Sequence, residues 1–131
     1  MASKTGEDVV EKLLEVSVSI PEQTILIKRL GITIKIRALS PSEVFELRRA
    51  CTFKNNRNNT EWFNEEGFFL GLIVKGTVEP DWRDKRLLEK YDAVSGEDVV
   101  KKLLLYGEVV EIAGLIMELS GVNEEVTEIK N

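Results

Sequence analysis

A single cysteine, Cys51, is the residue of this 131-residue chain best suited to nucleophilic chemistry. Arg48 and Arg49 lie just before it, and neighbouring cations can lower the pKa of a thiol. The chain contains no histidine, however, so the commonest general base is missing and no Cys–His or Ser–His pair can form. Because free cysteines are often buried, we interpret Cys51 as a small core residue on a helix rather than as a nucleophile. One cysteine forms no intrachain disulfide, which favours a cytoplasmic protein.

Carboxylates offer a second route to chemistry, through a bound metal ion. Glu65 with Glu66, and Asp81 with Asp84, are the clusters that a metal-dependent enzyme could use. Their spacing fits no recognised ligand pattern, and solvated helix faces explain them better. We therefore predict no catalytic residue, no metal ligand and no cofactor, and expect a protein that is not an enzyme; a metal-dependent enzyme is the weaker alternative.

The charge and hydropathy of the chain argue against two further kinds of partner. Arg48, Arg49, Lys54 and Arg57 form a basic cluster that could touch nucleic acid. The net charge of -5 opposes phosphate binding, and no aromatic residues are interleaved with these cations. The N-terminus lacks the apolar core of a signal peptide, and the longest apolar runs fall far short of the roughly 20 residues of a membrane span. We expect neither nucleic acid nor membrane as a partner.

Alternating apolar and polar residues predict a small sheet near the N-terminus. Residues 24–38 alternate on both sides of Gly31, which is typical of a β-hairpin that turns at this glycine. Residues 14–20 alternate in the same way and could add a third strand.

Helix signals follow this region. Ser40 as N-cap, Pro41 at the first helical position and Glu43 closing a capping box predict a helix that runs to about residue 53. The polar stretch "KNNRNNT" at residues 54–60 predicts a loop. A further short helix is expected over Asp84–Tyr91.

The helix after that loop should begin near Thr60 or Asn64 and concentrates much of the aromatic area of the chain. We interpret its aromatic side chains as core, and a recessed partner site is the alternative. These residues are Trp62, Phe63, Phe68 and Phe69.

A repeated sequence, "GEDVVEKLL" at residues 6–14 and "GEDVVKKLL" at residues 96–104, raises the question of an internal duplication. Each copy follows a capping hydroxyl, Thr5 or Ser95, with an aspartate three residues later. Beyond the repeat the first copy continues with strand periodicity and the second with helical spacing. The chain therefore uses one good helix start twice and contains no duplicated module.

The last helix is expected to run from residue 97 to about 120 and to end before Gly121. It carries two apolar stripes roughly 120° apart, which is more than a surface helix needs. We interpret the first as intramolecular: Val99, Leu103, Tyr106, Val110, Ala113 and Met117. We predict that the second binds another chain, a second copy or a client, with burial of both stripes in the monomer as the alternative; its residues are Leu105, Val109, Ile112 and Ile116.

Taken together, these patterns predict an α+β fold, namely a mostly helical single domain with a small antiparallel β-hairpin or three-stranded sheet near the N-terminus. The domain should span residues 1–131, with 1–13 and 122–131 loosely held.

The order of motifs also resembles a known family. "IRALSPSE" after a hairpin, "EPD" after an aromatic helix, and "ELSG" closing the last helix resemble the XkdN-like tail assembly chaperones of phages and prophages with contractile tails. The resemblance covers about residues 22–122. Asp92 stands where relatives often carry a glycine after the tyrosine of the short helix.

This resemblance implies a non-enzymatic role in the cytoplasm of a bacterial host. Such chaperones bind the tape measure protein, a long helical chain that sets tail length, and keep it soluble until tail tube subunits polymerise around it. The tail tube protein is the other partner implied, and the present chain would be the short form where a ribosomal frameshift makes a longer one. A structural or regulatory subunit of the tail, in the tube or the baseplate, is the alternative.

Overall fold

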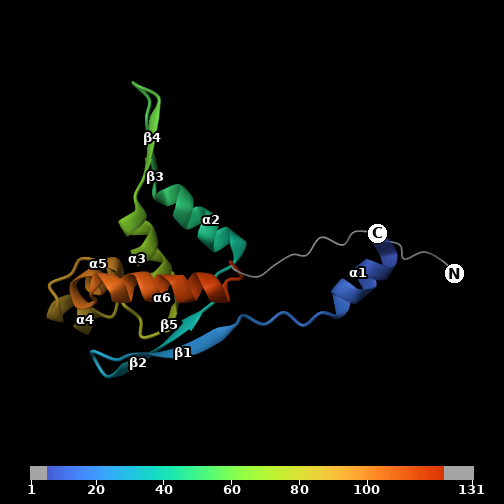
Figure 1. The fold of residues 1–131 in the computed structure, drawn as a ribbon, viewed down its shortest axis with the longest axis horizontal. Coiled ribbons are helices and arrows are strands. Elements are labelled where there is room, and N and C mark those ends of the chain that lie inside the picture. The colour runs from blue at the N-terminus through green and yellow to red at the C-terminus, as the bar shows by residue number, and fades with distance from the viewer. Residues whose placement is uncertain (1–5, 123–131) are drawn as a thin grey trace.

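A computed structural model describes residues 6–122 of the chain (Figure 1). It confirms the α+β fold, with a three-stranded antiparallel sheet packed against a helical majority. In chain order the elements are α1 (Gly6–Glu15), β1 (Glu22–Ile27), β2 (Ile32–Arg37), α2 (Pro41–Ala50), β3 (Thr52–Asn55), β4 (Thr60–Phe63), α3 (Glu65–Gly76), β5 (Thr77–Glu79), α4 (Lys85–Lys90), α5 (Gly96–Leu103) and α6 (Tyr106–Leu119).

The predicted hairpin is strands β1 and β2, which pair antiparallel and turn at Gly31 with a φ of +64°. The third strand is β5, which pairs with the other edge of β2, so the prediction that residues 14–20 supply this strand is wrong. Residues 16–21 have no regular structure. The reason is topological: a single residue, Pro21, separates the segment from β1, which leaves no room for the chain to turn back onto the sheet.

The core forms where the sheet meets α3, α5 and α6. Helix α3 is the central element, because it packs against α2, α5 and α6 and then leads directly into β5. Apolar side chains from both sides of this contact lose nearly all exposure to water, which is the main favourable contribution to folding. Those with less than 2% exposure are Ile34, Ile36, Leu72, Ile73, Val99, Val100 and Ile116.

Helix α2 begins as predicted and ends earlier than predicted. Ser40 and Glu43 form the reciprocal capping box, and Pro41 is the first helical residue. The helix ends at Ala50 instead of residue 53, because the chain then enters the strand pair β3–β4. The loop predicted at 54–60 is confirmed at its centre, residues 56–59, which form the turn of a second hairpin; its ends are wrong, because residues 54, 55 and 60 belong to the strands. This hairpin projects from the body in Figure 1.

The prediction of one continuous last helix is also wrong. The segment forms two helices, α5 and α6, separated by Leu104 and Leu105, whose backbone is extended. A salt bridge stabilises this break. The Arg29 guanidinium donates to both carboxylate oxygens of Glu108, at 3.0 and 2.8 Å, and to the carbonyl oxygen of Leu103 at 2.9 Å. Glu108 in turn accepts from the backbone N–H of Leu105 at 2.8 Å, so the exposed ends of both helices find partners.

The two similar helix starts have different surroundings. In α5, Ser95 accepts from the backbone N–H of Asp98 as predicted, and Asp98 pairs with Lys102 at 3.4 Å. Thr5, the corresponding cap of α1, lies outside the described residues. Helix α1 itself stands apart from the body, joined to it by the extended residues 16–21 (Figure 1).

The short helix α4 confirms the predicted one, with Asp84 as its N-cap. It ends at Lys90 with Tyr91 as its C-cap, and the next residue, Asp92, has a left-handed φ of 50°. Glycine adopts this conformation without strain, and aspartate is among the few other residues that tolerate it. The departure from the family pattern at this position is therefore structurally permitted.

Candidate partner-binding surface

Cys51 lies at the C-terminal cap of α2 and is buried, as predicted for a core residue. Burial raises the pKa of its thiol, and the negative charge of Glu97 raises it further. The thiolate, which is the reactive form, is therefore disfavoured. Of the two arginines that precede Cys51, Arg48 places its guanidinium over the rings of Phe63 and Phe68, at 5.7 and 5.1 Å from their centroids.

The acidic clusters are engaged with cations instead of converging on one point. Asp81 pairs with Arg83 at 3.2 Å, and Lys101 pairs with Glu66 at 2.6 Å. Between residues 6 and 122 the structure contains no group of three or more histidine, cysteine or acidic side chains that could hold a metal ion.

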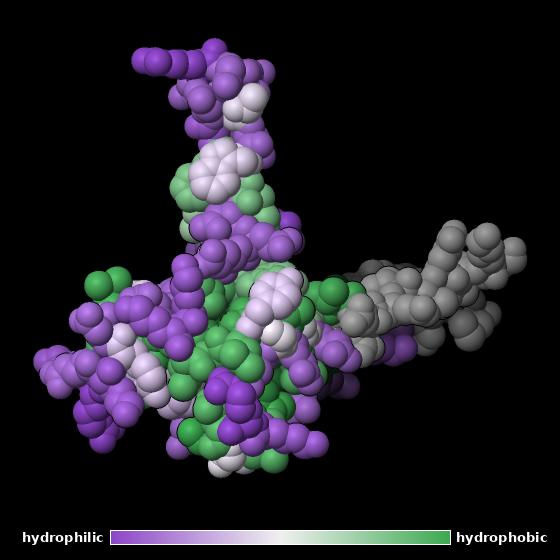
Figure 2. All heavy atoms as spheres, turned by 60° about the vertical axis from the view of Figure 1, so that its left-hand side comes forward, coloured by the Kyte–Doolittle hydropathy of each residue, from purple (hydrophilic) through white to green (hydrophobic). Residues whose placement is uncertain are grey.

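The aromatic residues divide between core and surface. Phe68 is buried on α3 as predicted, but Trp62 and Phe63 lie on β4 and are exposed, so the prediction that they belong to the core is wrong. Trp62 stacks on Phe53 across the hairpin, with ring centroids 4.5 Å apart. The pairing of these rings explains how a strand pair with so few apolar residues holds its register. Figure 2 shows the resulting projection, with a hydrophilic tip and a less polar base.

The two predicted stripes of the last helix are not separated as the sequence suggested. In the second stripe Leu105 is 57% exposed and Val109 is half-buried, whereas Ile112 and Ile116 belong to the core with 4% and 0% exposure. In the first stripe, Tyr106 is 81% exposed. Partner binding by the second stripe stays a prediction, and in this fold a partner can reach only its first two residues.

One groove lies between α3, α5 and the start of α6, and we call it the helical groove. It encloses about 380 Å³. Leu70 and Leu104 are buried at its base, Phe69 and Val109 are half-buried, and Tyr106 is exposed. The ion pair between Glu66 and Lys101 supplies its polar rim, together with Glu65. An apolar floor with a charged rim is the form that binds an amphipathic helix.

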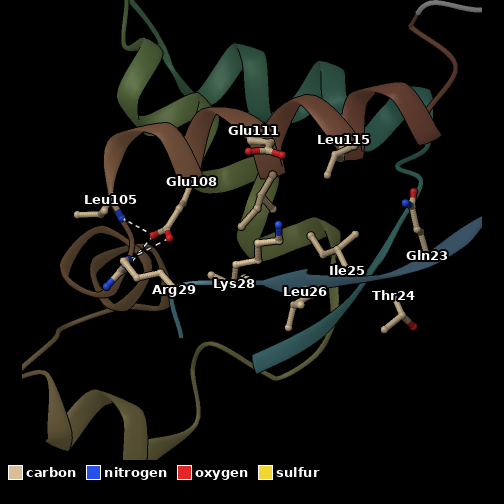
Figure 3. A pocket seen from close by; sticks show the side chains of 12 residues that line it. Gln23, Thr24, Ile25, Leu26, Lys28, Arg29, Leu105, Glu108, Glu111 and Leu115 are labelled. Carbon is tan, nitrogen blue, oxygen red and sulfur yellow. Dashed lines mark hydrogen bonds and ion pairs between the residues drawn. The ribbon is translucent and has the colours of Figure 1, made fainter. Parts of the chain in front are cut away.

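A second groove, the edge groove, runs between β1 and α6 and encloses about 740 Å³ (Figure 3). Its lower wall is the continuous stretch of residues 23–29, and its upper wall is the α6 side chains Leu105, Glu108, Glu111, Ile112 and Leu115. The salt bridge between Arg29 and Glu108 closes one end, lowering the pKa of the Glu108 carboxyl and raising that of the Arg29 guanidinium. Since β1 is the outermost strand of its sheet, its backbone edge is open to this groove.

A third exposed apolar surface is the N-terminal arm, residues 6–20. Helix α1 and the extended segment after it present aliphatic side chains that are all more than half exposed, an unusual concentration for a surface. They are Val9, Val10, Leu13, Leu14, Val16, Val18 and Ile20.

Across residues 6–122, no helix combines the length and apolarity needed to cross a membrane.

Known proteins match the chain over most of its length. Residues 10–131 match the family described as "Phage XkdN-like tail assembly chaperone protein". The "Phage-like element PBSX protein XkdN" of Bacillus subtilis (strain 168) is 25% identical over 122 residues, which span 85% of this chain and 82% of that protein. The crystal structure of the protein yqbn shares the fold, with a TM-score of 0.61 at 18% identity over 80% of this chain and 88% of that one.

Proposed function

The chain belongs to the phage XkdN-like tail assembly chaperone family and so acts in phage tail assembly, and we propose that its client is the tape measure protein. It binds this protein in the cytoplasm of the bacterial host and keeps it soluble until the tail tube forms around it. The role is one of binding, without a chemical step.

The observation that carries this proposal is the helical groove. A long helical client exposes apolar stripes that aggregate unless they are covered. The helical groove offers a matching receptor, because Phe69, Leu104 and Val109 line it with apolar surface and Lys101 places a cation at its rim. A net charge of -5 keeps the complex soluble after the apolar surfaces have been joined.

Tyr106 is the residue through which the proposal can be tested with least damage to the fold. It is 81% exposed and is the first residue of α6, where an acidic side chain is favoured by the helix dipole. Tyr106→Asp should therefore leave the domain folded while placing a charge at the mouth of the helical groove. Val94→Asp is the matched control, because Val94 is 92% exposed and lies outside that groove.

The experiment is co-expression of each variant with the tape measure protein of the same phage or prophage, followed by measurement of the soluble client and of co-purification. We expect the unaltered chain and Val94→Asp to hold the client in solution. Tyr106→Asp should weaken binding about tenfold or more, as truncation of a central aromatic contact does. Equal recovery with all three proteins would refute the groove as the client site. Finding the chain in purified finished particles would favour a structural tail subunit instead, since an assembly chaperone leaves.

A further inference from the structure

We propose that two copies of the chain exchange their N-terminal arms, so that residues 16–20 of each copy pair antiparallel with the free edge of β1 in the other. Each copy then supplies the strand that fills the edge groove of its partner. This assignment is independent of the client, and it gives the apolar arm a place to be buried.

The arm has the pattern of a strand that is covered on one face. Val16, Val18 and Ile20 alternate with Ser17 and Ser19, yet in the monomer all five are exposed and without regular structure. Alternation of this kind is characteristic of a half-buried strand. The segment therefore carries the pattern of a strand and lacks the neighbouring strand.

The edge groove has the complementary feature, a strand edge without a partner. β1 pairs with β2 on one side only, and seven consecutive residues, 23–29, line the groove on the other side. Consecutive residues point alternately to opposite faces, so a groove that they all line must run along the backbone edge. Adding a strand there satisfies free N–H and C=O groups and places its apolar face under α6.

The arm cannot fill the edge groove of its own chain. A hairpin needs at least two residues in its turn, and only Pro21 separates the arm from β1. The carbonyl oxygen of Pro21 accepts from the backbone N–H of Ala38 at 2.8 Å, so this residue already continues the sheet in the direction of β1. The arm thus leads away from its own sheet, and a second copy is the occupant that the topology allows.

The burial of β1 fixes the register. Ile25 and Ile27 face the core, whereas Leu26 is exposed. Placing the apolar face of the arm on the core side therefore requires Val18 opposite Ile25 and Val16 opposite Ile27 of the other copy. Within one chain the apolar residues of the arm are even-numbered and the core-facing residues of β1 are odd-numbered, so the chain changes face at Pro21 and the arm and β1 are separate strands. Applied to both copies, the exchange has two-fold symmetry.

The charges agree with this register and direction. Antiparallel pairing brings Glu15, the last residue of α1, next to Lys28, the residue after β1. Both side chains are exposed, and Lys28 makes no ion pair with any residue between 6 and 122. A parallel arrangement would instead bring Glu15 toward the acidic Glu22 at the start of β1. Opposite charges across strands stabilise a pair, and like charges destabilise it.

The area involved suits a stable dimer. Each paired segment exposes three aliphatic side chains, Val16, Val18 and Ile20, and each contributes on the order of 100 Å². Two such segments and the equal surfaces that they cover reach about 1,200 Å², the lower limit of standard protein interfaces.

The first test is the oligomeric state by size-exclusion chromatography with light scattering, without client. We expect the full chain to form a dimer and Val18→Asp to weaken its dissociation constant about 100-fold, because the carboxylate would face apolar side chains without a partner. Val18 is 91% exposed in the monomer, and Val94→Asp is again the matched control at 92%. The melting temperature should rise with protein concentration for the unaltered chain and Val94→Asp, and stay constant for Val18→Asp.

The second test is the register. Ser19 and Thr24 fall opposite each other on the exposed face, so the double variant Ser19→Cys/Thr24→Cys should oxidise to a disulfide-linked dimer. Ser17→Cys/Thr24→Cys, two residues out of register, should link far less efficiently, and Cys51 is buried and takes no part.

Four results would overturn the proposal. They are a monomeric unaltered chain at every concentration, a Val18→Asp dimer as tight as the original, equal weakening by Val94→Asp, or equal cross-linking of the two cysteine pairs. None of them bears on the client, because the tape measure protein is absent from both experiments.

Discussion

Gly76→Ala tests the packing of α3 on α6, the contact around which the core is organised. Gly76 is the last residue of α3 and is buried. A Cβ atom added there would lie 2.7 Å from Cδ1 and 2.8 Å from Cγ2 of Ile116. These separations are well inside van der Waals contact, and Ile116 is fully buried, so its side chain has no open space into which to move.

Two opposing contributions decide the size of the effect. Overpacking a well-filled core costs typically about 1–3 kcal/mol. Replacing glycine by alanine in a helix gains up to about 1 kcal/mol, and less at a helix end. We therefore expect Gly76→Ala to lower the free energy of unfolding by about 1–2 kcal/mol, which corresponds to a fall in melting temperature of about 3–10 °C for a domain of this size.

Gly114→Ala is the matched control, because it makes the same change in the interior of α6 where a Cβ atom meets nothing within 4 Å. We expect it to stabilise the domain by up to about 1 kcal/mol through helix propensity alone. Both variants can be compared with the unaltered chain by thermal and urea unfolding monitored by circular dichroism. If Gly76→Ala melts at or above the unaltered chain, or if both substitutions shift stability in the same direction, the α3–α6 contact is not packed as described.

Four further substitutions test other parts of the structure. Cys51→Ala should cost on the order of 1 kcal/mol of stability and leave client binding intact, as measured by co-purification. Hydrogen bonding by Arg37 and the Ser40 backbone lowers the pKa of Glu43 to about 2 from its ordinary value of 4.5, so its stabilising effect is complete above about pH 4.5 and is lost as the pH falls toward 2. Denaturant unfolding of Glu43→Gln at a series of pH values should show a smaller loss of the free energy of unfolding between pH 4.5 and pH 2, by on the order of 1 kcal/mol after allowance for solvent screening. The same pH dependence in the variant and the unaltered chain would contradict the pairing of Glu43 with Arg37. Asp92→Gly should raise the melting temperature. The left-handed backbone at this position costs an aspartate about 1 kcal/mol, and glycine adopts it without that strain. Ile112→Asp should unfold the domain, as seen by loss of the helical circular dichroism signal, because Ile112 is buried. A variant that stays folded would show that Ile112 lies at the surface instead of in the core.

The elements that could be predicted are those whose signals are local. The start of α2 is specified by Ser40, Pro41 and Glu43 within four residues, and the same short-range logic identified the β1–β2 hairpin and α4. The burial of Cys51 and Phe68 also followed from residue type. These signals depend on contacts between neighbours in the chain, which a sequence displays directly.

The break between α5 and α6 could not be predicted in this way. Leu104 and Leu105 are both good helix formers, and the one nearby residue that disfavours a helix, Gly107, is too weak a signal to predict a break. The break is stabilised by Arg29, more than seventy residues earlier in the chain, through its bonds to Leu103 and Glu108. A contact of that separation has no counterpart in local periodicity. Because the break changes the direction of the chain, it also changes which side chains of the two stripes reach the surface, so the predicted partner site was only partly accessible.

The N-terminal arm shows a different limit of periodicity. The alternation over residues 14–20 correctly describes a segment with one apolar face, but it says nothing about which surface covers that face. Within residues 6–122 of the monomer, no surface covers this face. The neighbouring strand position on β2 belongs to β5, and Pro21 keeps the arm from reaching the free edge of β1. An apolar strand pattern that its own fold leaves exposed must be covered by another chain or remain a site of aggregation. The wrong third strand and the proposed arm exchange therefore have one cause. The pattern was that of a strand, and the error lay in assuming that the strand pairs within its own chain.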